Sequence, residues 1–172
     1  GMLVTCDQQL ADKAAQFRNY GQSVRYHHPV LGMNSRLDEL HAAMLAERLK
    51  WLDEFTEARR GVAHAYWDRI DNPAVQLLKR PTDRRAHVHH LFVLTTDRRD
   101  ALQAHLTSQG VQTHIHYPIP VHHQEPCRDI LRDPQGLVHA EAHAQRCLSL
   151  PCHPFLTESE VSAVVDAVNS FA

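Results

Sequence analysis

The chain has 172 residues, with 18 basic and 20 acidic side chains and a formal net charge of −2. This length suits one compact unit or part of a larger domain. The charge offers no basic surface for nucleic acid, and no apolar run approaches the ~20 residues that span a bilayer. Because no signal-peptide pattern opens the chain and its four cysteines form no C-x-x-C pair, we expect a cytoplasmic protein with reduced thiols.

The first 70 residues are predicted to be mainly helical. Residues 2–5 form a short apolar run that we predict to be a strand, and Asp7 is placed to cap a following helix. Residues 21–33 have turn chemistry and no period. A long amphipathic helix is then predicted from about residue 36 to about residue 70, with a possible break at residues 51–53.

The start of this long helix carries a capping pattern. Asn34 and Ser35 can accept hydrogen bonds from free N–H groups of the first turn, and Asp38 lies three residues after Ser35, as in a capping box. A helix start presents N–H donors and a partial positive charge, so it can hold a phosphate. The alternative is an ordinary cap that binds nothing.

The remaining residues predict a small layered unit. Strands are predicted at 75–78, 89–95 and 111–115, and helices at 97–106, at 137–147 and after a capping box of Thr157 and Glu160. The fold class is α/β, and α+β within this region, with helices packed on one face of a small antiparallel sheet. We divide the chain into residues 1–71, the end of a large domain with a connecting helix, and residues 72–172, a small α+β domain.

Four segments of the chain carry a family resemblance. In chain order they are Arg18–Gln22 (RNYGQ), Gly32–Ala43 (GMNSRLDELHAA), His114–Gln124 (HIHYPIPVHHQ) and Leu148–Pro154 (LSLPCHP). Together they resemble segments of the sugar aminotransferases of the DegT/DnrJ/EryC1/StrS family, which use pyridoxal 5′-phosphate (PLP) and have the aspartate aminotransferase fold. The resemblance implies the C-terminal portion of such an enzyme, with the large cofactor domain missing.

The resemblance implies roles for individual residues. Asn34 matches an asparagine that reaches across the dimer to the cofactor phosphate of the other subunit. His116 matches a histidine near the cofactor and the sugar nucleotide, and with Tyr117 it ends a segment that Pro118 and Pro120 hold rigid.

Four further residues are candidates for substrate binding. His122 and Gln124 match family positions that shape the same pocket. Arg25 and Tyr26, in the loop before Asn34, are suited by their chemistry to a diphosphate and to a base or sugar. The alternative for each of these four residues is that it is an ordinary solvated residue of a loop.

The resemblance implies a reaction that this chain does not complete by itself. Such enzymes move an amino group, usually from glutamate, onto a keto-sugar carried by a nucleotide, and they need a lysine that forms a Schiff base with PLP. The three lysines are Lys13, Lys50 and Lys79, and none follows a strand in a small serine-containing loop. We therefore expect that lysine upstream of Gly1, no catalytic residue in this chain, an inactive isolated chain, and a homodimer or homo-oligomer.

A metal site is the rival interpretation of the 15 histidines. They cluster at residues 87–90 and 114–123, and His114 and His116 have the i, i+2 spacing of one strand face. No acidic residue or cysteine stands at motif spacing and no H-E-x-x-H occurs, so we predict no metal. The alternative function is a non-enzymatic, oligomeric binding module with a histidine-rich metal or ligand site.

Overall fold

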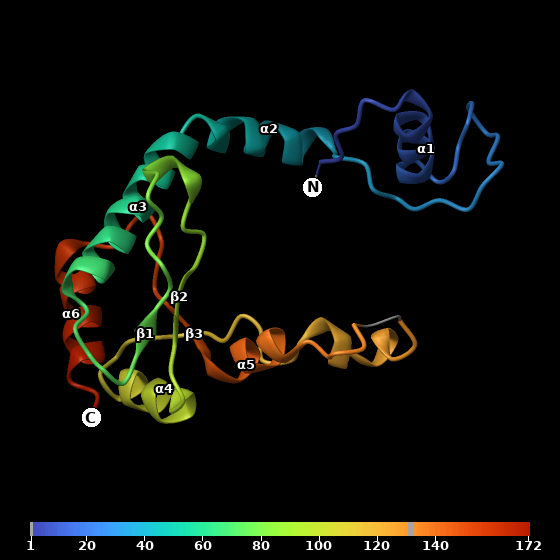
Figure 1. The fold of residues 1–172 in the computed structure, drawn as a ribbon. Helices are drawn as coiled ribbons and strands as arrows, with labels where there is room; N and C mark the ends of the chain where they lie inside the picture. The colour runs from blue at the N-terminus through green and yellow to red at the C-terminus, as the bar shows by residue number, and fades with distance from the viewer. Residues whose placement is uncertain (1, 131–132) are drawn as a thin grey trace. The chain divides into compact units, whose positions relative to one another are not determined.

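The computed structural model describes residues 2–130 and 133–172, and the chain forms two compact units that divide between Trp51 and Leu52 (Figure 1). The N-terminal unit holds helices α1 (Gln8–Arg18) and α2 (Glu39–Leu49), and the C-terminal unit holds the other helices and the sheet. In the described part of the chain, no helix combines the length and hydropathy that crossing a membrane requires. The division into domains at residues 71 and 72 stays a prediction.

The N-terminal unit confirms one predicted helix cap and corrects another. The Asp7 carboxylate accepts hydrogen bonds from the N–H groups of Gln9 and Leu10 at 2.8 and 3.2 Å, as predicted. Helix α2, however, is capped by Asp38, which accepts from the His41 N–H at 2.9 Å. The predicted cap by Asn34 and Ser35 is therefore wrong, because the backbone of these residues pairs with the end of α1 instead.

Two other predictions for the first 70 residues have different outcomes. The predicted strand at residues 2–5 is wrong, since among the described residues this apolar run has no ladder partner. The possible break in the long helix is confirmed, because α2 ends at Leu49 and α3 spans Leu52–Arg69. Helix α3 buries Val62, Ala63 and Tyr66 in the C-terminal unit.

The sheet confirms the predicted small antiparallel architecture. Its order is β1 (Gln76–Leu77), β2 (Phe92–Thr95) and β3 (Cys147–Leu150), and in the register Phe92 faces Leu150 and Leu94 faces Leu148. Strand β3 was not predicted. The predicted helix at 137–147 corresponds to α5 (Val138–Arg146), which ends one residue earlier, and β3 begins at the next residue. The predicted strand at 111–115 is reduced to a single bridge between His114 and Ser149.

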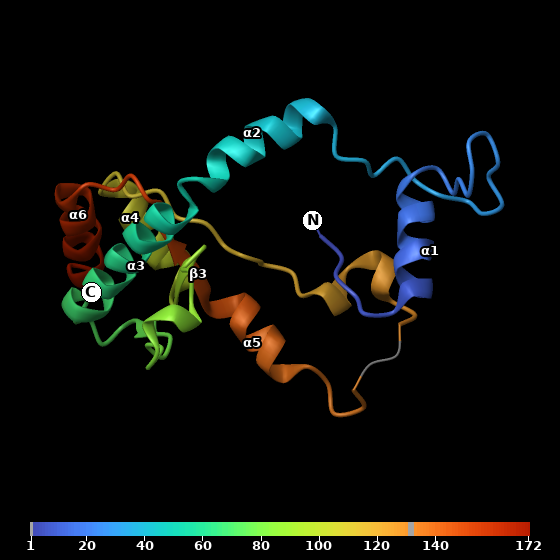
Figure 2. The same cartoon turned by 90° about the horizontal axis from the view of Figure 1, so that it is seen from above.

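Three helices build the core of the C-terminal unit against the sheet. Helices α3, α4 (Arg99–Ser108) and α6 (Glu158–Asn169) gather beside β2 and β3 in both views (Figures 1 and 2). Fully or almost fully buried core residues come from all of these elements: Tyr66, Phe92, Leu94, Leu102, Leu106, Leu148, Val164 and Val168. The capping box of Thr157 and Glu160 is present at α6, as predicted. The N-cap of α4 is Arg98, which makes no side-chain hydrogen bond there.

A buried amide ties the end of α6 to the chain that follows α3. Asn72 Nδ2 donates to the carbonyl groups of Val168 and Phe171 at 2.7 and 2.8 Å, and Asn72 Oδ1 accepts from the Ala74 N–H at 2.8 Å. Between these core elements the chain makes three short 3₁₀ turns: η1 (Arg84–Ala86), η2 (Val121–His123) and η3 (Glu125–Cys127). The turn η2 carries His122 and His123, which are described below.

Candidate functional site

Two of the four resembling segments pair with each other in the N-terminal unit. Asn19 and Asn34 form an antiparallel bridge at the end of α1. The Tyr20 N–H donates to the Met33 carbonyl at 3.0 Å, and the Ser35 N–H donates to the Arg18 carbonyl at 2.9 Å. Residues 18–20 and 33–35 therefore form one backbone-paired structure, although a loop of a dozen residues separates them.

Two glycines close the base of this loop. Gly21 has a φ of +72°, and a Cβ added there would lie 1.8 Å from the Val30 carbonyl oxygen. A Cβ added to Gly32 would lie 1.9 Å from the backbone nitrogen of Gly21. Because backbone atoms fill the space that a side chain would need, glycine is required at both positions. The contact fixes the chain that leads into Asn34.

The Asn34 side chain is exposed at this fixed position. Among the described residues its amide has no hydrogen-bond partner, so its NH₂ group is available to donate to an anion. Arg25 and Tyr26 occupy the centre of a tight turn between Val24 and His27, where the guanidinium lies 5.0 Å from the centre of the Tyr26 ring. The structure thus places Asn34 at the paired base of the loop and the other two candidates in a turn within it.

The other two resembling segments pair with each other in the C-terminal unit. The backbones of His114 and Ser149 exchange two hydrogen bonds, at 3.2 and 2.7 Å. The His116 Nδ1 lies 2.9 Å from the Ser149 hydroxyl oxygen, and the Cys147 thiol donates to the His116 carbonyl. Ser149 was not predicted as a site residue. The only feature of the sequence that could have pointed to Ser149 is its place in the Leu148–Pro154 segment. Its contact with His116 Nδ1 orients the His116 ring.

The candidate substrate residues of this unit line two cavities. The half-buried His116 lines a small cavity of about 160 Å³ together with His114 and Ser149. Tyr117 and His122 line a larger, mostly apolar cavity of about 580 Å³, whose other wall includes residues of α5. Gln124 is exposed between η2 and η3. The structure therefore brings Tyr117 and His122 to one cavity and gives His116 a different one.

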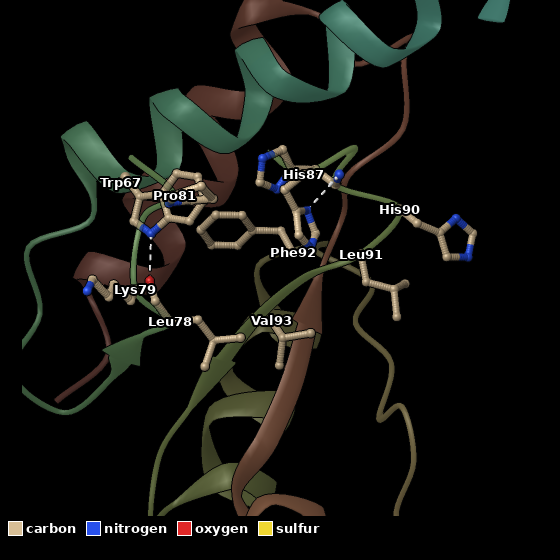
Figure 3. A pocket seen from close by; sticks show the side chains of 10 residues that line it. Trp67, Leu78, Lys79, Pro81, His87, His90, Leu91, Phe92 and Val93 are labelled. Carbon is tan, nitrogen blue, oxygen red and sulfur yellow. Dashed lines mark hydrogen bonds between the residues drawn. The ribbon is translucent and has the colours of Figure 1, made fainter. Parts of the chain in front are cut away.

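The histidines at residues 87–90 line a third cavity, of about 440 Å³ (Figure 3). His89 is buried against Trp67, and its backbone N–H donates to His87 Nδ1 at 2.9 Å. Burial, with a smaller contribution from the neighbouring His87, lowers the pKa of His89 to about 4, so the ring is neutral at pH 7. The His90 side chain points away from His87 (Figure 3), and among the described residues these histidines form no group that could hold a metal ion.

The three lysines all lie at exposed positions. Lys13 is on α1, Lys50 pairs with Glu47 at the end of α2, and Lys79 lies at the rim of the cavity in Figure 3. Desolvation is one way in which a lysine that forms a Schiff base is activated, and exposed side chains are not desolvated. The exposed Asn34 amide can donate to an anion such as a phosphate, whereas the three exposed lysines lack the desolvation that activates a covalent attachment point.

Comparisons with known proteins agree with the resembling segments. The profile of the DegT/DnrJ/EryC1/StrS aminotransferase family matches residues 1–169. Over 174 residues the chain is 40% identical to the dTDP-3-amino-3,6-dideoxy-alpha-D-galactopyranose transaminase of Aneurinibacillus thermoaerophilus, covering 99% of this chain and 46% of that protein.

Solved structures give the same picture. DesV of S. venezuelae, in complex with a ketimine intermediate, matches with a TM-score of 0.84 and 38% identity, over 96% of this chain and 45% of that one. NtdA of Bacillus subtilis, with its cofactor PMP bound, matches with a TM-score of 0.79 and 29% identity, over 95% and 40% of the two chains. The fold prediction is confirmed, and the chain spans about half the length of the relatives it matches.

Proposed function

This chain belongs to the DegT/DnrJ/EryC1/StrS aminotransferase family, and on that premise we propose that it forms part of a PLP-dependent nucleotide-sugar aminotransferase. The whole enzyme would transfer an amino group from an amino acid, glutamate in this proposal, to a keto-sugar carried on a nucleotide. We also place it in the cytoplasm, which the unpaired thiols of the buried Cys147 and Cys152 support. One observation carries the proposal: the four resembling segments, which are separate in sequence, form two pairs in the structure.

Asn34 is the proposed contribution of the N-terminal unit. Its amide would donate to the phosphate of PLP in the other subunit of a homodimer. The unpartnered side chain and the glycine contact that fixes its backbone support this role, because a rigid donor loses little entropy on binding. A hydrogen bond to a charged group contributes ~1.5–3 kcal/mol, so its loss would weaken PLP binding ~10- to 100-fold.

The C-terminal unit would supply the edge of the substrate site. His116, oriented by Ser149, can donate or accept a hydrogen bond at a sugar hydroxyl. Tyr117 and His122 would bind apolar and polar parts of the sugar nucleotide at their shared cavity, and Gln124 would lie beside them. In the N-terminal unit, Arg25 would pair with the diphosphate and Tyr26 with the base or sugar.

The chemistry of the transfer would lie on other polypeptide. PLP acts as an electron sink for the carbon that gains or loses the amino group. This chain's own residues bind and orient, and none of its exposed lysines is suited to hold the cofactor covalently. We therefore propose that the 172-residue chain by itself has no transaminase activity.

A chimeric enzyme tests the proposal. In it, this chain replaces the matching section of the S. venezuelae aminotransferase, and glutamate-dependent amination of a dTDP-linked keto-sugar is measured with added PLP. We expect turnover by the chimera and none by the isolated chain. A folded chimera that binds PLP and does not turn over would contradict the proposal. So would turnover by the isolated chain that is lost when Lys13, Lys50 or Lys79 is replaced by alanine.

A further inference from the structure

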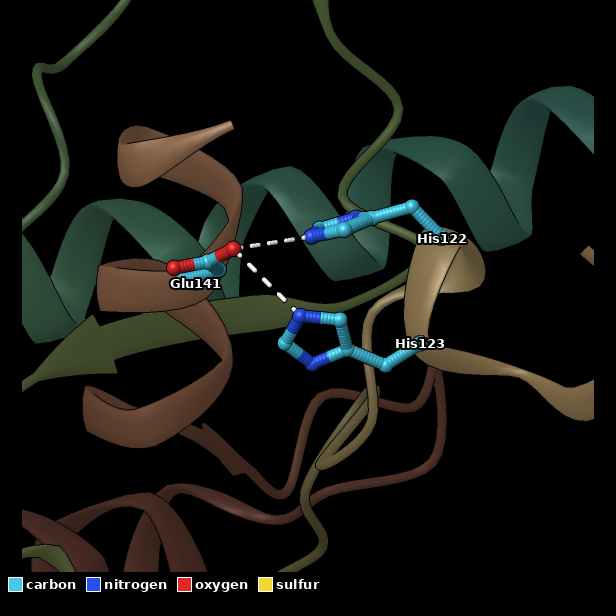
Figure 4. A group of neighbouring side chains, drawn as sticks. All are labelled: His122, His123 and Glu141. Carbon is cyan, nitrogen blue, oxygen red and sulfur yellow. Dashed lines mark hydrogen bonds and ion pairs between the residues drawn. The ribbon is translucent and has the colours of Figure 1, made fainter. Parts of the chain in front are cut away.

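Three side chains that can bind a metal converge in the C-terminal unit. Figure 4 shows the rings of His122 and His123 pointing toward the carboxylate of Glu141. The His122 Nε2 lies 3.0 Å and the His123 Nε2 lies 3.3 Å from the same Glu141 oxygen. One ligand atom from each residue lies within 4.8 Å of the others, and no other such group of three occurs within residues 2–130 and 133–172.

The group joins two elements that are separate in sequence. His122 and His123 are neighbours on the short turn η2, whereas Glu141 is on helix α5, 19 residues after His122. The His122 side chain is 12% exposed and gives the group a buried wall, while the side chains of His123 and Glu141 are 49% and 38% exposed. An ion can therefore enter from solvent without any opening of the core.

The spacing of the ligand atoms suits a small tetrahedral ion. Zinc binds histidine nitrogen and carboxylate oxygen at ~2.0–2.2 Å, and in a tetrahedron bonds of this length place neighbouring ligand atoms ~3.3 Å apart. The two separations of 3.0 and 3.3 Å in the structure are close to that value. Two imidazoles and one carboxylate are also a known ligand set for zinc sites that keep a fourth position open.

We propose that His122, His123 and Glu141 bind a zinc ion that joins η2 to α5 and keeps its fourth position toward solvent. The ion would replace the direct contacts between the two imidazoles and the carboxylate, and it would hold the His122 ring at the wall of the cavity it shares with Tyr117. The inference does not rest on the aminotransferase proposal. His122 has a part in both, so the test uses His123 and Glu141.

Zinc binding to the purified full chain tests this site directly. Equilibrium dialysis against zinc chloride, with the metal counted by mass spectrometry, is expected to give one tightly bound ion per chain. Glu141→Gln and His123→Ala are each expected to weaken that binding more than ~10-fold, because losing even an outer-shell partner of a zinc ligand costs 10- to 100-fold. Cobalt(II) in place of zinc is expected to give the visible absorbance of a tetrahedral site, and the two variants to lose it.

Matched controls separate this site from scattered binding by the other histidines. His139→Ala removes an exposed imidazole from the same helix, and Glu54→Gln removes an exposed carboxylate from α3. Both are expected to bind zinc like the unaltered chain. Circular dichroism checks that each variant is folded, and Glu141→Gln keeps the size of the side chain. Equal zinc binding by all four variants, or no stoichiometric binding by the unaltered chain, would show that the group is only an ion pair.

Discussion

Replacing His89 with asparagine is expected to make the stability of the C-terminal unit less sensitive to acid. The His89 ring is 4% exposed and packs edge-on against Trp67, with ring centres 5.3 Å apart. Burial is the main reason that its pKa falls from 6.5 to about 4. The residue has a φ of +48°, a left-handed conformation that asparagine adopts more readily than most residues. The substitution therefore removes the titrating ring and leaves the backbone conformation accessible.

The size of the effect follows from the two pKa values. Between pH 6.5 and about 4 the unfolded chain binds a proton at this position and the folded chain does not, so the free energy of unfolding falls as the pH falls through this range. A tenfold difference in proton affinity is worth ~1.4 kcal/mol, which gives a full effect of ~3 kcal/mol. Of this, ~2 kcal/mol is lost between about pH 7.5 and about pH 5, before most carboxylates titrate.

Urea unfolding at these two pH values measures the effect. The unaltered chain and His139→Asn, which changes an exposed ring on α5, are expected to lose ~2 kcal/mol each on acidification. His89→Asn is expected to start from a lower stability, because packing on Trp67 is lost, and then to lose less than half as much. Burial also lowers the pKa of His64, and this accounts for the acid sensitivity that remains in His89→Asn. A full loss of stability in His89→Asn, or no loss in the unaltered chain, would show that His89 does not titrate with a lowered pKa.

Further predictions concern a buried amide in the C-terminal unit and one glycine in each unit. Asn72→Ala removes the donor to carbonyl groups at the end of α6 and is expected to lower the free energy of unfolding by ~3 kcal/mol in urea titrations. The control Asn169→Ala changes a more exposed amide and is expected to lower it by less. Equal losses of stability in the two variants would contradict the role given to Asn72. Gly32→Ala places a Cβ 1.9 Å from a backbone nitrogen and is expected to speed amide hydrogen exchange in residues 17–35 markedly. Gly61→Ala, on an open face of α3, is expected to raise stability by ~1 kcal/mol in the same titrations, and a loss would show that the face is occupied.

Local patterns predicted those parts of the fold that depend on local contacts. The capping box at Thr157 and the cap at Asp7 were predicted because donor and acceptor lie within three residues of each other. The cap of α2 was assigned to Asn34 and Ser35, and their backbone is instead drawn into pairing with residues 18–20, a contact that no local pattern contains. Strand β3 was missed because four fully buried residues at a helix end have no period to detect.

The candidate site also combines features that the sequence predicted with contacts that it did not. The resemblance named Asn34 and His116 as candidates, but it did not name the side chains around them, since Ser149 lies 33 residues from His116. The ligand set of the proposed zinc site was rejected from sequence because no acidic residue stood at motif spacing. Glu141 supplies that ligand from helix α5, which folds back onto η2. Neither residue spacing nor composition predicts that the loop between η2 and α5 brings these residues together.

The affinity of the chimeric enzyme for PLP tests whether Asn34 binds the cofactor phosphate. The dissociation constant is measured by fluorescence titration for the chimera, for its Asn34→Ala variant, and for Gln9→Ala, which changes an exposed side chain on α1. We expect Asn34→Ala to weaken PLP binding ~10- to 100-fold and Gln9→Ala to leave it unchanged. Equal affinities for all three proteins would contradict the claim that this chain binds the cofactor phosphate through Asn34.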